Sequence, residues 1–305
     1  MLYLQRLRWD RIVGWAAVGL SVAMLCFWAF WGVNENFHEG WYFRSLWQNV
    51  GLMVIQYLSP ALILLLPTLA ALQWPRWSLV FFSVPAILVW KLFHFQNSVA
   101  ARMVVAPLLL MGVLYRLGKP EPRRWAFRAV VGLPLLTAVV SGAVPAWRVL
   151  GRLDDGNYGA RRVEGNGVTL VWAPEGPGWP DQGASWWDAE DACQRLTPDG
   201  HALASSPQNV WRLPTADEAV RSMVYRGKNA GGVWDARAAT AKYRSWPDKD
   251  SPLWKPHSQV IYWWTGTQLD ERRAYRIAYN GYVIALPKKG WGAYWAYRCV
   301  CDPKG

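Results

Sequence analysis

Acidic residues are scarce in this chain, and one long stretch has none. The 305 residues include 21 Asp and Glu against 33 Lys and Arg, and positions 50–120 contain no acidic residue. Most of the acidic residues fall in positions 150–305, so the chain has two unlike halves. Because a domain takes ~100–200 residues, this length allows about two domains.

The basic excess does not indicate a nucleic-acid-binding protein. A formal net charge of +12 would favour nucleic acid if it lay on one soluble face. Much of it lies instead in short loops between apolar segments, a pattern typical of membrane topology. We therefore expect no nucleic-acid partner.

Cysteine and histidine are also rare, which narrows the possible chemistry. The four cysteines are Cys26, Cys193, Cys299 and Cys301, and none has zinc-ligand spacing with histidines. His201 and His257 are isolated, with no Ser or Cys nucleophile signature nearby. The sequence supports neither a metal site nor a catalytic triad, and we expect no cofactor.

Long apolar runs fill the first half, positions 1–150. A transmembrane helix needs ~20 mostly apolar residues to cross ~30 Å of hydrocarbon. The stretches that come close to this length are 12–33, 50–74, 78–95, 103–117 and 129–147. They predict a multi-pass α-helical membrane domain of about five helices, although four spans stay possible because the third and fourth stretches are short.

Four basic side chains interrupt those two short stretches near their ends: Lys91, His94, Arg102 and Arg116. Long basic side chains near a helix end reach the interface without any functional role. An ionisable pathway built on Lys91 and His94 is the alternative.

Loop charges predict the orientation. Nine basic residues would lie on the N-terminal side of the membrane: Arg6, Arg8, Arg11, Arg76, Arg116, Lys119, Arg123, Arg124 and Arg128. The loops on the other side carry only Arg44 and Arg102. Because basic loops stay in the cytoplasm, we expect a cytoplasmic N-terminus and a soluble second half on the outer face.

Turn and cap signals predict a compact second half after a linker at 151–164. Ser185 and Asp188 favour one helix start, and Thr215 with Glu218 matches a capping box at another. Alternating residues before Asn280-Gly281 indicate a tight hairpin. We expect a mixed α+β domain over 165–305.

Four ordered motifs in that half carry a family resemblance, and they span 185–193, 211–218, 262–267 and 297–301. An Arg-Leu-Pro-Thr-x-x-Glu motif combined with a terminal Arg-Cys strand resembles the C-type-lectin-like domains related to formylglycine-generating (sulfatase-modifying-factor) proteins. The bacterial lectin-like domains of unknown function in that group are the most similar. The resemblance implies two helices flanking a small antiparallel sheet, and the membrane half resembles nothing comparable.

The resemblance also implies a long-range disulfide from Cys193 to Cys299, with Cys301 as a competing partner and two reduced thiols as the alternative. The family's copper-binding cysteine pair has no counterpart, since positions 200–298 contain no cysteine. No Glu-Pro-Asn, Gln-Pro-Asp or Trp-Asn-Asp triplet offers a lectin calcium site. The family's enzyme activity is therefore not expected here.

An aromatic and basic set supplies the candidate binding residues: Trp263, Trp264, Arg272, Arg273, Trp291, Tyr294 and Trp295. Flat aromatic faces stack on sugars or peptide, and they also build cores. We interpret Tyr275 and Tyr279 as core, and Trp291, between two glycines, as facing a ligand.

The leading hypothesis is a non-enzymatic binding or accessory protein of the bacterial inner membrane. It would present a lectin-like domain to the periplasm or exterior and bind a membrane or envelope protein or a glycan, with membrane lipid around its helices. One alternative is a membrane enzyme acting on a lipid-linked or envelope substrate, near Pro60, Pro67, Lys91 and His94. Another is a diversified surface receptor.

Overall fold

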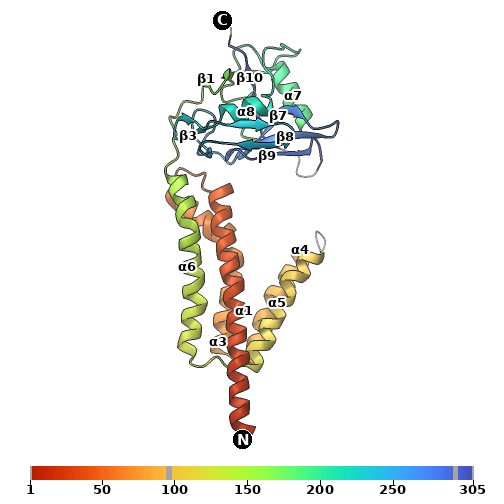
Figure 1. Ribbon diagram of the computed structural model, residues 1–305. Helices are drawn as coiled ribbons and strands as arrows, with labels where there is room; N and C mark the ends of the chain where they lie inside the picture. Colours follow the sequence, from red (N-terminus) through yellow and green to blue (C-terminus); the bar gives the residue numbers. More distant parts are fainter. Residues whose placement is uncertain (1, 94–97, 291–294, 304–305) are drawn as a thin grey trace. The chain divides into compact units, whose positions relative to one another are not determined.

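The computed structural model describes residues 2–93, 98–290 and 295–303 (Figure 1). The chain forms two compact units. The helical unit comprises Met1–Trp41 and Ser45–Trp147, and the small-sheet unit comprises Tyr42–Arg44 and Arg148–Gly305.

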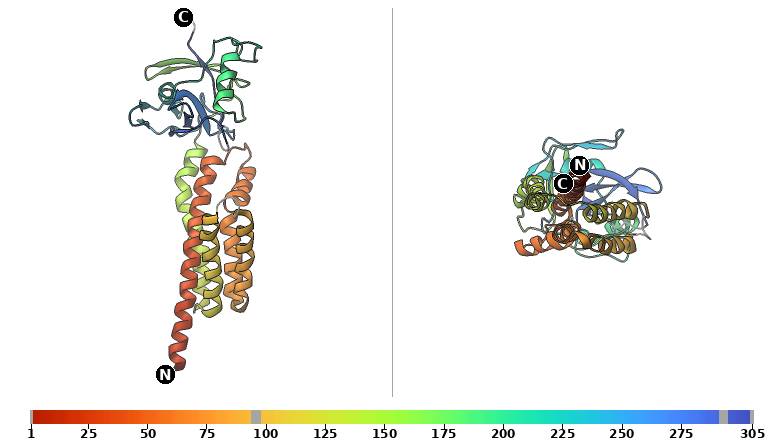
Figure 2. Two further views of the ribbon diagram at one scale, coloured as in Figure 1. Left: turned by 90° about the vertical axis from the view of Figure 1, so that its right-hand side faces the viewer. Right: turned by 90° about the horizontal axis from the view of Figure 1, so that it is seen from below.

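Over its described residues, the helical unit contains six α-helices, with a short π-helix and a short 3-10 turn between them. The elements are α1 (Leu2–Glu39), α2 (Leu46–Leu52), the π-helix η1 (Met53–Tyr57), α3 (Ser59–Gln73), the 3-10 turn η2 (Pro75–Trp77), α4 (Ser78–Phe93), α5 (Ser98–Leu117) and α6 (Arg123–Leu150). Figures 1 and 2 show α1 and α6 running alongside each other, whereas the paired helices α4 and α5 lean away from them in Figure 1. The last turn of α6 belongs to the small-sheet unit.

Two described helices are long and apolar enough to cross a membrane, namely Trp9–Glu39 and Arg123–Leu150. They contain the first and last predicted spans. The second predicted span is broken, because Leu46–Tyr57 and Ser59–Gln73 meet at a bend of 64°. Pro60 at the start of α3 has no N–H to donate, which favours a new helix there. This pair counts as a third span only if both halves are taken together.

The third and fourth predicted spans do not satisfy that test over the described residues. They correspond to α4 and α5, which pack against each other. The described part of α4 has 16 residues, which is about 24 Å, short of ~30 Å of hydrocarbon. Lys91 lies exposed in its last turn, and Arg116 lies in the last turn of α5. His94 falls outside the described residues.

Close backbone contacts hold α1 against the turn that precedes α6. The backbone N–H of Lys119 donates to the Asp10 carbonyl at 2.8 Å. A Cβ atom on Gly14 would lie 2.3 Å from the Pro120 nitrogen, so only glycine fits there. Near the other end of α1, Val33 packs against Gly142 of α6, where an added Cβ would lie 2.5 Å from the Val33 side chain. The two longest apolar helices therefore run parallel.

The small-sheet unit contains two helices and ten short strands over its described residues. They are β1 (Arg161–Gly165), β2 (Val168–Trp172), α7 (Trp186–Arg195), α8 (Ala216–Ser222), β3 (Val224–Tyr225), β4 (Lys228–Asn229), β5 (Val233–Asp235), β6 (Thr240–Lys242), β7 (Tyr262–Gln268), β8 (Arg273–Ala278), β9 (Val283–Pro287) and β10 (Val300–Cys301). All pairings are antiparallel, in sheets β1-β2-β10, β3-β4, β5-β6 and β7-β8-β9.

A disulfide and stacked indoles fix the core of this unit. Cys193 of α7 bonds to Cys299, 106 residues later, and both side chains are fully buried. Cys301 lies outside this bond. Trp254 stacks on Trp263 of β7, with ring centroids 3.6 Å apart. The pairing implied by the family resemblance is thus present in the structure.

Both predicted helix caps and the predicted hairpin are confirmed. Ser185 is the N-cap of α7, and its hydroxyl accepts a hydrogen bond from the Asp188 N–H. Thr215 and Glu218 form a complete capping box at the start of α8. Asn280 and Gly281 connect β8 to β9, where Gly281 has a φ of +82° that favours glycine.

The predicted linker at 151–164 is shorter in the structure, because the chain is fastened from Arg152 onward. Arg152 Nε donates to Asp248 at 2.8 Å, and the Leu153 N–H donates to the Asp250 carboxylate at 2.6 Å. Strand β1 already begins at Arg161. The local composition of 151–164 indicated a linker. The residues that hold this segment lie almost 100 positions later in the sequence, so local composition does not reveal them.

The capping box should make the small-sheet unit sensitive to acid. Burial alone would raise the pKa of Glu218, but hydrogen bonds from Arg212 and the Thr215 N–H outweigh it and lower the pKa. Stability from this carboxylate is therefore present above its ordinary pKa and lost as the pH falls through the lower folded value. Glu218→Gln should lower the free energy of unfolding by about 1 kcal/mol at pH 7.

Urea unfolding of wild type and variant at pH 7, 5 and 3 checks this expectation. The difference between the two proteins should shrink as the pH falls. Glu271→Gln, at an exposed position, is the control and should change little at any pH. A difference that stays constant down to pH 3 would contradict the assignment.

Candidate functional site

Two of the predicted binding residues are core residues. Trp263 and Trp264 are 1% and 0% exposed. As neighbours in β7 they point to opposite faces of the strand, and both faces are covered. Trp263 packs with Trp254, whereas Trp264 lies in the cluster around Trp186 and the disulfide. Neither indole has a face that a ligand could reach, so both belong to the core, which is the alternative that the sequence left open for these aromatic residues.

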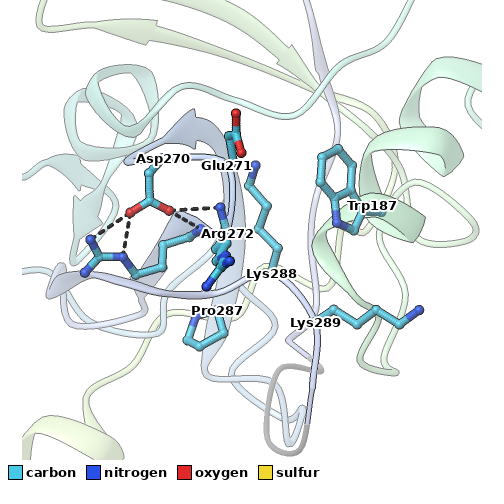
Figure 3. A pocket seen from close by; sticks show the side chains of 8 residues that line it. Trp187, Asp270, Glu271, Arg272, Pro287, Lys288 and Lys289 are labelled. Atoms are coloured by element: carbon cyan, nitrogen blue, oxygen red, sulfur yellow. Dashed lines mark hydrogen bonds and ion pairs between the residues drawn. The ribbon is translucent and has the colours of Figure 1, made fainter.

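Arg272 and Arg273, in contrast, line a surface pocket of about 870 Å³ (Figure 3). It lies where the β7–β8 turn and the end of β9 approach the start of α7. The lining residues are Trp187, Asp270, Glu271, Arg272, Arg273, Pro287, Lys288 and Lys289.

Asp270 organises the turn that forms one wall. Its Oδ1 atom accepts the backbone N–H groups of Arg272 and Arg273 at 2.9 and 2.7 Å. Its Oδ2 atom pairs with the Arg273 guanidinium at 2.7 Å. The side-chain hydrogen bond from Arg273 lowers the pKa of Asp270. Arg273 therefore holds the turn, and the charge of Asp270 is balanced within the protein.

Lys288 is a buried cation at the base of the pocket. Its Nζ atom lies 4.5 Å from the ring centroids of both Trp186 and Trp187 and donates to the Gln268 side chain. Backbone bonds from Trp186 to Lys288 (3.0 Å) and from Lys288 to Arg272 (2.9 Å) join α7, β9 and the turn. Burial raises the pKa of nearby Glu190, and the Lys288 charge opposes that rise. Over the described residues, Lys288 makes no salt bridge within 4 Å.

Trp187 supplies the apolar surface of the pocket. Its side chain is 49% exposed and meets the Trp186 ring edge-to-face at 4.8 Å. Sequence reasoning placed Trp187 only in a helix start. The missed signal is that adjacent residues on a helix point about 100° apart, so two neighbouring indoles on an amphipathic helix cannot both face the core.

The remaining predicted residues lie elsewhere or cannot be placed. Trp295 is half-buried, and its ring meets that of Tyr262 edge-to-face at 5.0 Å. The Arg276 guanidinium lies over both rings, 4.0 Å from the Trp295 centroid and 3.7 Å from the Tyr262 centroid. Trp295 does not line the pocket. Trp291 and Tyr294 fall outside the described residues.

The pocket can hold an anion beside a flat ring. Lys288, Arg272 and Lys289 supply positive charge, and the exposed indole of Trp187 supplies a stacking surface. Elsewhere in the unit, His257 Nε2 lies 3.9 Å from Asp154. Among the described residues, no three His, Cys, Asp or Glu side chains come together as metal ligands.

Comparison of the chain with protein-family models, with curated proteins and with solved structures finds no significant match.

Proposed function

We propose that this chain is a non-enzymatic binding protein of the bacterial cytoplasmic membrane. Its helical unit is the anchor, its N-terminus is cytoplasmic, and its small-sheet unit faces the periplasm or exterior. The two long apolar helices support the anchor. The disulfide between Cys193 and Cys299 supports an oxidising compartment for the small-sheet unit, because cytoplasmic thiols are kept reduced.

The small-sheet unit is proposed to be a C-type-lectin-like domain of the sulfatase-modifying-factor group. Helices α7 and α8, the short antiparallel strands and the bond from the first helix to the last strand support this assignment. The arrangement agrees with what the sequence motifs implied. Positions 200–298 contain no cysteine, so the copper-binding cysteine pair of that group has no counterpart in this sequence.

The ligand is proposed to be an acidic glycan or an acidic segment of a protein partner. The observation that carries this proposal is the half-exposed indole of Trp187 in one pocket with the exposed cationic side chains of Arg272 and Lys289, together with the buried ammonium of Lys288. An indole face stacks on a sugar or aromatic ring, and exposed cations beside it attract a carboxylate.

Trp187→Ala should weaken binding about 30-fold, which corresponds to roughly 2 kcal/mol for a central aromatic anchor. Titration of the purified chain with oligogalacturonate and with a polyglutamate peptide identifies the ligand class, and neutral dextran reports non-ionic sugar binding. Arg272→Glu with Lys289→Glu should also abolish binding of the anionic probes. The control is Leu203→Ala, at an exposed position outside the pocket. If the pocket variants bind like wild type, the pocket is not the site.

A further inference from the structure

The path of the chain brings one face of the small-sheet unit to the end of α6. The final turn of α6, Arg148–Leu150, belongs to this unit, and the Arg152 N–H donates to the Val149 carbonyl at 3.4 Å. Only Gly151 separates the helix end from Arg152, whose side chain is buried against Asp248. Since consecutive Cα atoms lie 3.8 Å apart, the path from that helix end to Asp248 is no longer than two residues and one arginine side chain.

The loop after α1 reaches the same region of the unit. Tyr42–Arg44, between α1 and α2, belongs to the small-sheet unit. Burial and Asp154 raise the pKa of the Tyr158 phenol to about 12, and the charge of Arg44 opposes this rise, so Arg44 lies near Tyr158. The Tyr158 hydroxyl in turn donates to Asp154 at 2.9 Å. Two chain segments that leave apolar helices therefore meet residues 152–158.

Exposed aromatic side chains flank this attachment point. Trp246, two residues before Asp248, is 54% exposed, and Tyr282 is 60% exposed. The Tyr243 ring packs 5.6 Å from that of Trp246, and its hydroxyl donates to the Gly281 carbonyl at 3.0 Å. This contact places Tyr282 beside Trp246. Leu153, next to the buried Arg152, is 46% exposed.

The charges that surround these side chains are positive. Arg226, Lys228 and Arg244 are exposed. One Asp250 carboxylate accepts the N–H groups of both Arg226 and Leu153, at 3.0 and 2.6 Å, so these two residues are neighbours. Asp248 and Asp250 are themselves buried, 5% and 1% exposed, with hydrogen-bond partners. The face thus exposes cations, whereas Asp248 and Asp250 are buried. The nearby exposed carboxylate of Asp155 is paired with Arg161 at 2.8 Å.

From these observations we infer that this face lies in the headgroup layer of the bilayer that α6 crosses, and that it favours anionic lipid. We name it the headgroup face and define it as Leu153, Arg226, Lys228, Arg244, Trp246 and Tyr282. Trp and Tyr are the side chains enriched at the membrane–water interface, and Lys and Arg near an anionic leaflet gain from its negative potential. This inference rests on the proposed membrane anchoring and adds a second contact between protein and lipid.

Quenching by headgroup spin labels tests the inference on the full chain in nanodiscs. Trp246→Cys, in a background with Cys26→Ser and Cys301→Ser, carries a small bimane fluorophore, and the lipid carries a nitroxide on its headgroup. Leu203→Cys, in the loop that pairs with Leu196 after α7, is the matched control. Quenching at position 246 should be at least about twofold stronger than at position 203. Tyr282→Cys should behave like Trp246→Cys and serves if that variant does not fold.

Charge supplies the second readout. Adding Arg226→Glu and Arg244→Glu to the labelled protein should reduce quenching at position 246, and replacing anionic lipid with zwitterionic lipid should do the same in the parent. Equal quenching at positions 246, 282 and 203 would overturn the headgroup face. Failure of the chain to enter nanodiscs would overturn both the face and the anchor. The orientation is tested separately, by labelling Leu203→Cys in cells with an impermeant maleimide. If position 203 is labelled only after the cells are lysed, the proposed orientation is wrong. The headgroup face would still stand, because quenching in nanodiscs does not depend on the orientation in the cell.

Discussion

Replacing Cys193 and Cys299 with alanine is expected to lower the free energy of unfolding of the small-sheet unit by about 4 to 5 kcal/mol. The bond closes a loop across 106 residues, and closure of so long a loop removes much of the entropy of the unfolded chain. It also joins α7 to the segment that leads into β10, so it is a covalent link between the first helix and the last strand of the unit. A loss of this size is a large part of the ~5–15 kcal/mol that stabilises a typical domain.

Pulse proteolysis of the full chain in nanodiscs, over a series of urea concentrations, measures this change. Cys301→Ala is the control, because Cys301 lies outside the disulfide, and it should shift the unfolding midpoint by far less. Reduction of the wild type should reproduce the double-alanine result. A double-alanine variant with the wild-type midpoint would show that the two ends are held by packing alone.

Local signals in the sequence predicted local structure well. Each helix cap acts over three residues, in Ser185 with Asp188 and in Thr215 with Glu218, and Asn280-Gly281 acts within one turn. None of these three signals therefore depends on distant parts of the chain. The pairing of Cys193 with Cys299 is different, because spacing could not choose between Cys299 and Cys301. Only the resemblance of the surrounding motifs to a known family implied it.

The binding residues were harder to predict, because exposure depends on what covers each face. Trp263 and Trp264 carry the same chemistry as Trp187, yet distant residues such as Trp254 and Trp186 bury both of them. Lys288 was overlooked for the opposite reason. A lysine near the end of a strand is usually solvated, and only the approach of α7 turns this one into a buried cation over two indoles.

The membrane half shows a similar limit. Apolar composition predicted 50–74 as one continuous span, although Pro60 lies within it. The π-helix at Met53–Tyr57 and the 64° bend after it arise where the backbone bonding pattern changes. Hydropathy averages over such a break, so it indicates apolar length and not continuity.

Arg298 should be the most sensitive single side chain of the small-sheet unit. It is fully buried and donates to the carbonyl oxygens of Ala173, Pro252 and Leu253 at 2.9, 2.8 and 2.8 Å. Its guanidinium carbon lies 3.6 Å from the centroid of the Trp179 ring. Burial lowers the pKa of Arg298, while the carbonyl dipoles and the ring face favour its charged form. One side chain thus joins the loop at Pro252 and Leu253 to the end of β2 and to the segment that leads into β10.

Arg298→Met keeps much of the side-chain volume but removes every donor, so three carbonyl groups lose their charged hydrogen-bond partner inside the core. We expect a loss of about 4 kcal/mol in the free energy of unfolding, measured by the same urea series. Arg298→Lys should recover only part of this loss, because an ammonium lacks the planar fork that reaches several carbonyls. Arg195→Met is the control, since its pair with Asp191 is 3.6 Å long and exposed. If Arg298→Met were as stable as Arg195→Met, the loops would be held by their own packing and the buried guanidinium would have to serve another purpose.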